Sequence, residues 1–130
     1  GIEMKLTKTA LLKKTPDLFD TPDNVYREFQ YYYEREKSEL PSNLVLLYAD
    51  YTYEYYSGDA YVLGYDKEKK QFFEVHGSHC SCYGLEGQWD EEYYEDVKQL
   101  QAAIERRFSN RSKYSRYAHS SKEFQKWLES

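Results

Sequence analysis

The stretch LVLLYADYTYEYYSGDAYVLGYDKEKKQFFEVH, residues 44–76, decides the fold. It opens with the apolar run 44–47 and continues with tyrosines at alternate positions (51, 53 and 55), which is the period of a strand with one buried face. We expect Ser57-Gly58-Asp59 to form a turn and residues 66–70 a charged hairpin loop. Strands are expected at 60–65 and 71–76, so the stretch predicts an antiparallel meander of three strands.

A helix is expected before the meander. Thr21-Pro22-Asp23 combines a hydroxyl N-cap, a proline at the first helical position and an acid in the first turn, and Pro41 closes the element. These signals predict a helix over residues 22–39. The stripe at helical spacing consists of Val25, Phe29, Tyr32 or Tyr33, Glu36 and Leu40, and only Glu36 is out of character for a buried position.

A second helix is expected to begin at Asp90. The acids that follow it would lie near the positive end of the helix dipole, and apolar residues recur at helical spacing. The expected buried stripe is Tyr93, Val97, Leu100, Ile104 and Phe108. Residues 120–123 resemble a capping box and predict a last helix that buries Phe124, Trp127 and Leu128.

These elements predict a single α+β domain over residues 1–130, with an antiparallel sheet of three or slightly more strands packed against two or three helices. Residues 1–3 precede Met4 and resemble a cloning remnant. Residues 5–19 are compatible with either a short strand or a single helical turn that ends before Pro16.

The charge of the chain is unevenly distributed. Residues 50–100 contain twelve acids and four bases, and the net charge of the whole chain is −5. Because phosphate contacts supply most nucleic-acid affinity, we do not expect direct nucleic-acid binding. One segment of the chain is basic and contains Arg106, Arg107, Arg111, Lys113 and Arg116. It forms either a solvated helix end or a local patch that binds RNA or an acidic partner.

The sequence contains no apolar run near the roughly 20 residues that a membrane-spanning helix needs. It also lacks a secretory-signal pattern at its start, and its two cysteines, Cys80 and Cys82, are too close in an extended chain for an unstrained disulfide. The expected compartment is therefore a reducing cytoplasm.

The residues that could bind a metal ion lie close together in one short segment. His76, His79, Cys80 and Cys82 offer the nitrogen and sulfur ligands that zinc prefers, but neighbouring side chains of an extended segment diverge. We therefore expect residues 77–89 to form an ordered packing loop or a kinked edge strand, and we favour no metal, although zinc is the alternative. A thiol nucleophile, Cys80 or Cys82 beside His76, His79 or His119, is a further alternative. No catalytic residue or cofactor is assigned.

One block of sequence resembles a known group of proteins. Residues 56–63 (YSGDAYVL), 72–75 (FFEV) and above all 77–89 (GSHCSCYGLEGQW) resemble a block found in small uncharacterised bacteriophage and prophage proteins. The resemblance covers the middle of the chain and assigns no activity to individual residues. It implies a phage-like origin, and small acidic phage proteins often inhibit host defences, including CRISPR effectors.

Together these features predict a non-enzymatic, phage-type inhibitor that binds a host defence protein through an acidic, tyrosine-rich surface. The expected contact residues are Tyr51, Tyr53, Tyr55, Glu91, Glu92, Tyr94 and Glu95. Two alternatives remain open at this stage. One is a small metal- or nucleotide-binding protein or enzyme built on the His76–Cys82 loop, and the other is a homodimer that pairs through its strand edges.

Overall fold

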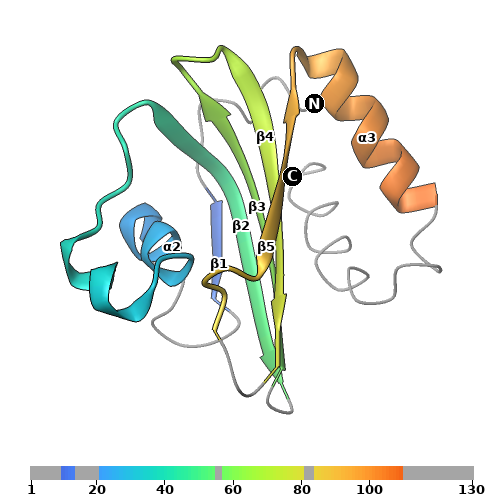
Figure 1. Cartoon of the computed structure of the whole chain (residues 1–130). Helices are drawn as coiled ribbons and strands as arrows, with labels where there is room; N and C mark the ends of the chain where they lie inside the picture. The colour runs from blue at the N-terminus through green and yellow to red at the C-terminus, as the bar shows by residue number, and fades with distance from the viewer. Residues whose placement is uncertain (1–9, 14–20, 55–56, 81–83, 110–130) are drawn as a thin grey trace.

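The structure is a computed structural model that describes residues 10–13, 21–54, 57–80 and 84–109. These residues form a twisted five-stranded sheet with helices on both faces (Figure 1). The elements in chain order are β1 (Ala10–Lys13), α2 (Pro22–Glu28), the 3-10 helix η1 (Tyr32–Lys37), β2 (Leu44–Glu54), β3 (Ser57–Asp66), β4 (Gln71–His79), β5 (Trp89–Tyr94) and α3 (Val97–Ser109).

The strands lie in the order β1-β2-β3-β4-β5. The last four form an antiparallel meander, and β1 pairs with β2 in parallel. The expected α+β class is therefore confirmed. The sheet exceeds the three expected strands because β1 lies within the ambiguous segment 5–19 and because β5 was expected to be helical.

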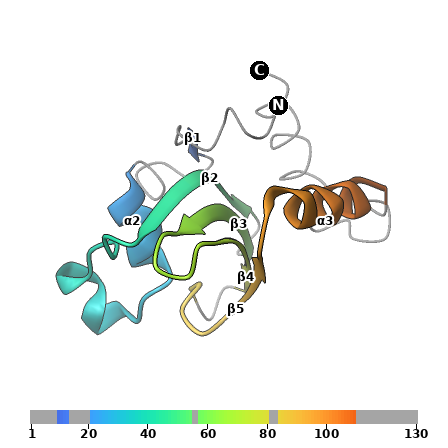
Figure 2. The same cartoon turned by 90° about the horizontal axis from the view of Figure 1, so that it is seen from above.

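Each face of the sheet carries its own apolar core. On the face toward α2, called here the α2 side, Val25 packs with Leu46, Val62 and Phe73. On the opposite face, the α3 side, a second core includes Leu47, Tyr48, Leu63, Leu100 and Ile104. Viewed from above, the sheet separates α2 from α3 (Figure 2).

The prediction of a turn at Ser57-Gly58-Asp59 is wrong, because these residues begin β3 and pair with residues 52–54 of β2. The hairpin expected at 66–70 is confirmed, with the turn itself at residues 67–70. The Asp66 carboxylate accepts hydrogen bonds from the backbone N–H groups of Glu68 and Lys69 at 2.9 and 3.2 Å, which explains why an acid precedes this turn.

The helix expected over 22–39 starts correctly but ends early. Thr21 caps α2 by accepting a hydrogen bond from the Asn24 N–H at 3.1 Å, and Pro22 takes the first position. The chain then folds back, so that the Leu40 N–H donates to the Asp23 carboxylate at 2.9 Å. A continuous helix rises about 1.5 Å per residue and would separate these two residues by roughly 25 Å.

The helix expected from Asp90 is also corrected. Trp89–Tyr94 forms β5, which pairs with β4, and α3 begins only at Val97. The Asp96 carboxylate accepts a hydrogen bond from the Gln99 N–H at 2.9 Å, and the Gln99 amide oxygen accepts one from the Glu95 N–H at 3.1 Å. This exchange resembles a capping box and fixes the start of α3. The expected burial of Leu100 and Ile104 is confirmed.

The helix expected near residues 120–128 lies outside the described residues. Within the described ranges, no helix has the length and apolar character needed to cross a membrane.

Candidate functional site

Four large aromatic side chains are exposed near one another on the α2 side of the molecule. The exposed fractions are 51% for Tyr31, 83% for Tyr32, 76% for Tyr33 and 37% for Trp89. The Tyr31 and Tyr33 rings stack with centroids 6.0 Å apart, and Trp89 contacts Phe29 edge to face at 5.8 Å. Such large aromatic surface is typical of protein-binding sites.

Contacts between η1 and the turn before β5 position these rings. Arg35 forms an ion pair with Glu86 at 3.0 Å and donates from Nε to the Gln30 carbonyl at 3.1 Å. The Tyr31 hydroxyl lies over Gly87, 3.2 Å from the point where a Cβ atom would stand. The tyrosine run is therefore tied to the turn that leads into Trp89. We define the aromatic–acidic surface as Tyr31, Tyr32, Tyr33, Trp89 and Glu91.

Glu28 lies behind this arrangement at the end of α2. Burial raises the pKa of Glu28, and the neighbouring Glu86 carboxylate raises it further, while Arg35 and His79 oppose the shift. The Arg35–Glu86 pair is thus part of a small charged group beneath the aromatic–acidic surface.

An apolar pocket of about 150 Å³ opens beside the aromatic–acidic surface. Val25 and Phe29 of α2 form one wall, and Val62 and Phe73 belong to its floor. Another part of its boundary is contributed by Trp89, Glu91 and Tyr93, the three β5 residues whose side chains lie on the α2 side. The pocket is therefore lined by the sheet, a helix and an edge strand.

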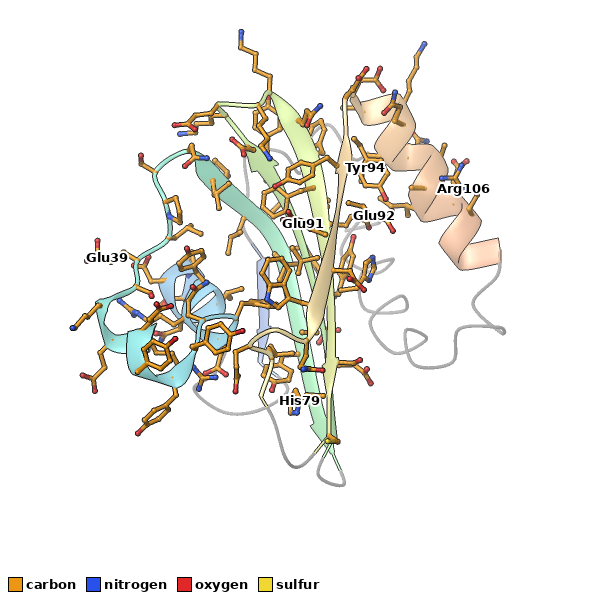
Figure 3. All side chains as sticks on the ribbon, viewed as in Figure 1. Glu39, His79, Glu91, Glu92, Tyr94 and Arg106 are labelled. Carbon is orange, nitrogen blue, oxygen red and sulfur yellow. The ribbon has the colours of Figure 1, made fainter. Side chains whose placement is uncertain are left out.

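The side chains of β5 alternate between the two faces. Figure 3 shows Glu91 on the α2 side, and Glu92 and Tyr94 on the α3 side. Asp90, Glu91 and Glu92 are all exposed. The edge strand therefore presents carboxylates on both faces.

The structure distributes the seven expected contact residues unequally. Glu91, Glu92 and Glu95 are exposed, as a contact role requires. Tyr51 and Tyr94 are only 3% and 8% exposed, which corrects their expected place on the surface. The side chain of Tyr53 and the whole of Tyr55 lie outside the described part of the chain.

Tyr94 belongs to a buried polar cluster on the α3 side. Glu74 has no exposed surface, and one of its oxygens accepts a hydrogen bond from the Tyr61 hydroxyl. The Tyr94 hydroxyl lies 2.8 Å from the other Glu74 oxygen and 2.8 Å from a Glu92 oxygen. Burial, reinforced by both carboxylates, raises the pKa of Tyr94, so this phenol stays neutral at pH 7.

The metal-ligand candidates that the structure describes do not come together. Strand alternation places His76 on the α3 side, with its ring centroid 5.2 Å from that of Tyr61. His79 lies on the α2 side beside Tyr51. Cys80 is exposed, and Cys82 is not among the described residues. Within the described ranges, no three His, Cys, Asp or Glu side chains form a metal-binding group.

The His79 ring is already engaged by two protein groups. Nε2 lies 2.5 Å from the Tyr51 hydroxyl, and Nδ1 lies 2.9 Å from the Cys80 carbonyl oxygen. A carbonyl only accepts hydrogen bonds, so Nδ1 carries the proton and, in the neutral ring, Nε2 accepts from Tyr51. This arrangement gives His79 no contact with the Cys80 thiol of the kind that a thiol nucleophile requires.

The basic segment is only partly described. Arg106 is exposed on α3 (Figure 3), whereas the side chain of Arg107 and residues 111–116 lie outside the description. The alternative of a local RNA-binding patch therefore stays a prediction.

Sequence reasoning missed Tyr31, Tyr32, Tyr33 and Trp89 as surface residues. It expected Tyr32 or Tyr33 in a buried helical stripe, but both are exposed. The signal was present in the run itself, because three consecutive aromatic residues cannot all lie on one stripe of a helix.

Comparison of the chain with protein-family models, with curated proteins and with solved structures finds no match.

Proposed function

We propose that this chain is a non-enzymatic binding protein that inhibits a basic partner protein through its aromatic–acidic surface. The observation that carries the proposal is the exposure of Tyr31, Tyr32 and Tyr33 together with Trp89, which borders an apolar pocket beside Glu91. Tyrosine and tryptophan provide most of the binding energy in many interfaces, since they bury a large area at low entropic cost.

The acidic side chains define the partner. Glu91 is exposed beside Trp89 on the α2 side, Asp90 and Glu92 are exposed on the opposite face of the same strand, and Glu95 and Asp96 follow them. A surface of this sign attracts basic proteins and repels nucleic acid, whose phosphates carry the same charge. The partner is thus a protein with a basic surface, as proteins that handle nucleic acid commonly have.

The source of the partner follows from the resemblance of residues 56–63, 72–75 and 77–89 to phage and prophage proteins. That resemblance supports a bacterial host defence protein as the target, acting in the host cytoplasm. A CRISPR effector or another nucleic-acid-processing defence complex has the required basic surface. Occupying that surface would exclude the nucleic acid and so inhibit the complex.

The test is affinity capture from a bacterial host lysate with three immobilised proteins. The wild type and a control variant, Lys98→Ser with Gln101→Ser on α3, are expected to retain the same stoichiometric protein. The variant Tyr32→Ser with Tyr33→Ser is expected to lose it, because these two hydroxyphenyl groups are the most exposed of the four. Circular dichroism confirms that all three are folded.

The proposal is rejected if no stoichiometric protein is captured, or if Tyr32→Ser with Tyr33→Ser retains as much of it as the wild type does. A captured partner whose nucleic-acid-processing activity is unaffected by the wild-type protein rejects the inhibitory part of the proposal.

A further inference from the structure

β5 is the last strand of the described sheet and pairs on one side only, with β4. Its backbone phase follows from one hydrogen bond: the Ser78 N–H donates to the Gln88 carbonyl at 3.1 Å, which makes Ser78 and Gln88 a hydrogen-bonded pair. In an antiparallel ladder such pairs alternate with non-bonded ones. Asp90, Glu92 and Tyr94 therefore direct their backbone groups toward β4.

The intervening residues, Trp89, Glu91 and Tyr93, direct their backbone N–H and C=O groups outward. The same three residues place their side chains on the α2 side and line the apolar pocket. Along β5, the residues whose backbone groups face outward are therefore the same residues whose side chains line the pocket. An extended segment added antiparallel to this edge would direct every second side chain toward the pocket.

The charges of β5 determine which kind of extended segment can pair with its outer edge. Asp90 and Glu92 are exposed on the α3 side and Glu91 on the α2 side. A second copy of β5 added antiparallel would set these carboxylates against one another, which is destabilising. A segment with basic side chains instead places opposite charges across the new ladder.

We propose that β5 accepts an extended, basic segment of the partner as an added antiparallel strand, with an apolar side chain of that segment in the pocket bounded by Trp89, Glu91 and Tyr93. This mode of binding rests on the proposed function and specifies how its partner is held. The segment carries apolar residues at alternate positions and lysine or arginine between them.

The pocket volume fits this role. A cavity of about 150 Å³ is large enough to hold a benzene-sized group. One leucine or phenylalanine side chain of the segment would fill the space between α2 and β5. Its basic neighbours would lie on the α3 side, opposite Asp90 and Glu92.

The probe is a capped heptapeptide in which leucine and lysine alternate, with affinity measured by isothermal titration calorimetry. A peptide with glutamate in place of lysine is expected to bind at least about tenfold more weakly, since each tenfold corresponds to about 1.4 kcal/mol. N-methylation of the leucines is expected to cost about tenfold or more, because their N–H groups face β5. N-methylation of the lysines is expected to leave the affinity within about twofold.

Variants of the protein provide the reciprocal test. Glu91→Pro removes an outward N–H without touching the ladder to β4, as proline on an edge strand permits, and is expected to weaken peptide binding. Glu91→Gln keeps that N–H and tests the charge alone. In the wild type, amide hydrogen exchange at Trp89, Glu91 and Tyr93 is expected to slow when the peptide binds, which requires no variant.

Three results would overturn strand addition. One is that N-methylation of the leucines and of the lysines lowers the affinity equally, and another is that the glutamate peptide binds as tightly as the lysine peptide. The third is that amide hydrogen exchange at Trp89, Glu91 and Tyr93 is unchanged when the peptide binds. These results are independent of the capture experiment. Loss of the captured partner in Tyr32→Ser with Tyr33→Ser, together with a peptide that shows no methylation pattern, supports the binding function and rejects strand addition. A methylation pattern without any captured partner supports strand addition and rejects the proposed inhibitor.

Discussion

Glu74 shows how single residues set the polar interior of this protein. Its carboxylate is fully buried on the α3 side and accepts hydrogen bonds from the hydroxyls of Tyr61 and Tyr94. An unsatisfied carboxylate at this position would cost several kcal/mol, and the two tyrosines are among the donors that satisfy it. The abundance of tyrosine in the chain thus has a structural cause here as well as one at the surface.

Replacing Tyr94 by phenylalanine removes one of these donors while keeping the ring. We expect Tyr94→Phe to lower the free energy of unfolding by about 1–3 kcal/mol, because a buried carboxylate loses one of its hydrogen bonds. Urea unfolding followed by circular dichroism measures the change. The matched control is Tyr93→Phe, whose hydroxyl donates to the exposed Glu91 carboxylate at 3.3 Å, and it is expected to change stability by less than about 0.5 kcal/mol.

Glu28 makes stability depend on pH in a defined direction. Its folded-state pKa is raised above the ordinary 4.5, chiefly by burial, so the folded protein binds its proton more tightly than the unfolded chain does. The stability that protonated Glu28 contributes is fully present below pH 4.5, and it is lost as the pH rises through the folded-state pKa of Glu28. Glu28→Gln is therefore expected to be more stable than the wild type at pH 7, with a smaller loss of stability between pH 4.5 and pH 7. Urea unfolding at several pH values tests this, and an identical pH profile in both proteins would contradict it.

At the scale of elements, β5 shows where local pattern and tertiary structure disagree. Its acids suit the start of a helix, which the sequence predicted at Asp90. In the structure Trp89 and Tyr93 pack on the α2 side, while Tyr94 reaches Glu74 on the α3 side. Only a strand places aromatic residues on both faces of a sheet within six residues.

The elements that local signals specify could be predicted from the sequence. The hairpin at 66–70, the start of α2 and the apolar stripe of α3 all follow from turn residues, caps and periodicity. The break after Glu28 could not be predicted, because it depends on the distant Leu40 N–H bonding to Asp23. Part of the candidate site follows from the sequence, since the exposure of Glu91 and Glu92 was expected. The exposed tyrosines were missed because Tyr31 and the 3-10 helix with Tyr32 and Tyr33 come after that break.

The pairing of β3 with β4 depends on a residue without a side chain. Gly64 lies opposite Phe73, and a Cβ atom there would stand 2.3 Å from the Phe73 ring and 2.8 Å from the Val45 carbonyl oxygen. We expect Gly64→Ala to lower the free energy of unfolding by about 1–3 kcal/mol, because the ring and the strand must both shift. Thermal unfolding measures this.

Gly84→Ala is the control for that substitution. The nearest atom to its added Cβ is the Glu86 carboxylate oxygen, at 2.5 Å, which belongs to a side chain that can move. A cost below about 1 kcal/mol is expected. Equal losses in the two variants would show that the space beside Gly64 is not as restrictive as the structure indicates.

At the scale of the whole molecule, charge separates the exposed strand edge from the cores. Asp90, Glu91 and Glu92 lie together on β5, the last strand of the sheet that the described residues form, whereas both faces of the central strands are apolar apart from a few buried groups. Charged residues on an edge strand prevent sheets of two molecules from pairing. The acids thus disfavour pairing with a second copy, and in the proposed function the same charges attract the basic partner.

Removing these charges is expected to promote self-association. We expect the triple variant Asp90→Asn, Glu91→Gln, Glu92→Gln to form dimers or larger species at concentrations where the wild type shows less association, because the edge keeps its backbone groups and loses its repulsion. Light scattering over a concentration series measures the difference. Lys98→Gln on the exposed face of α3 is the control, and no added association of the triple variant would contradict the role of the acids.

The irregularity in β2 has a consequence for how the chain tolerates changes in length. The register with β3 shifts between Leu46 and Tyr48, so Leu47 and Tyr48 both face the α3 side while Leu46 and Ala49 face the α2 side. Deleting Leu47 would leave a regular alternation, and every remaining side chain would keep its face, at the cost of one buried leucine. Deleting Ala49 would move the side chains on one side of the deletion to the opposite face of the sheet. A deletion in this strand is therefore expected to be less disruptive at Leu47 than at Ala49.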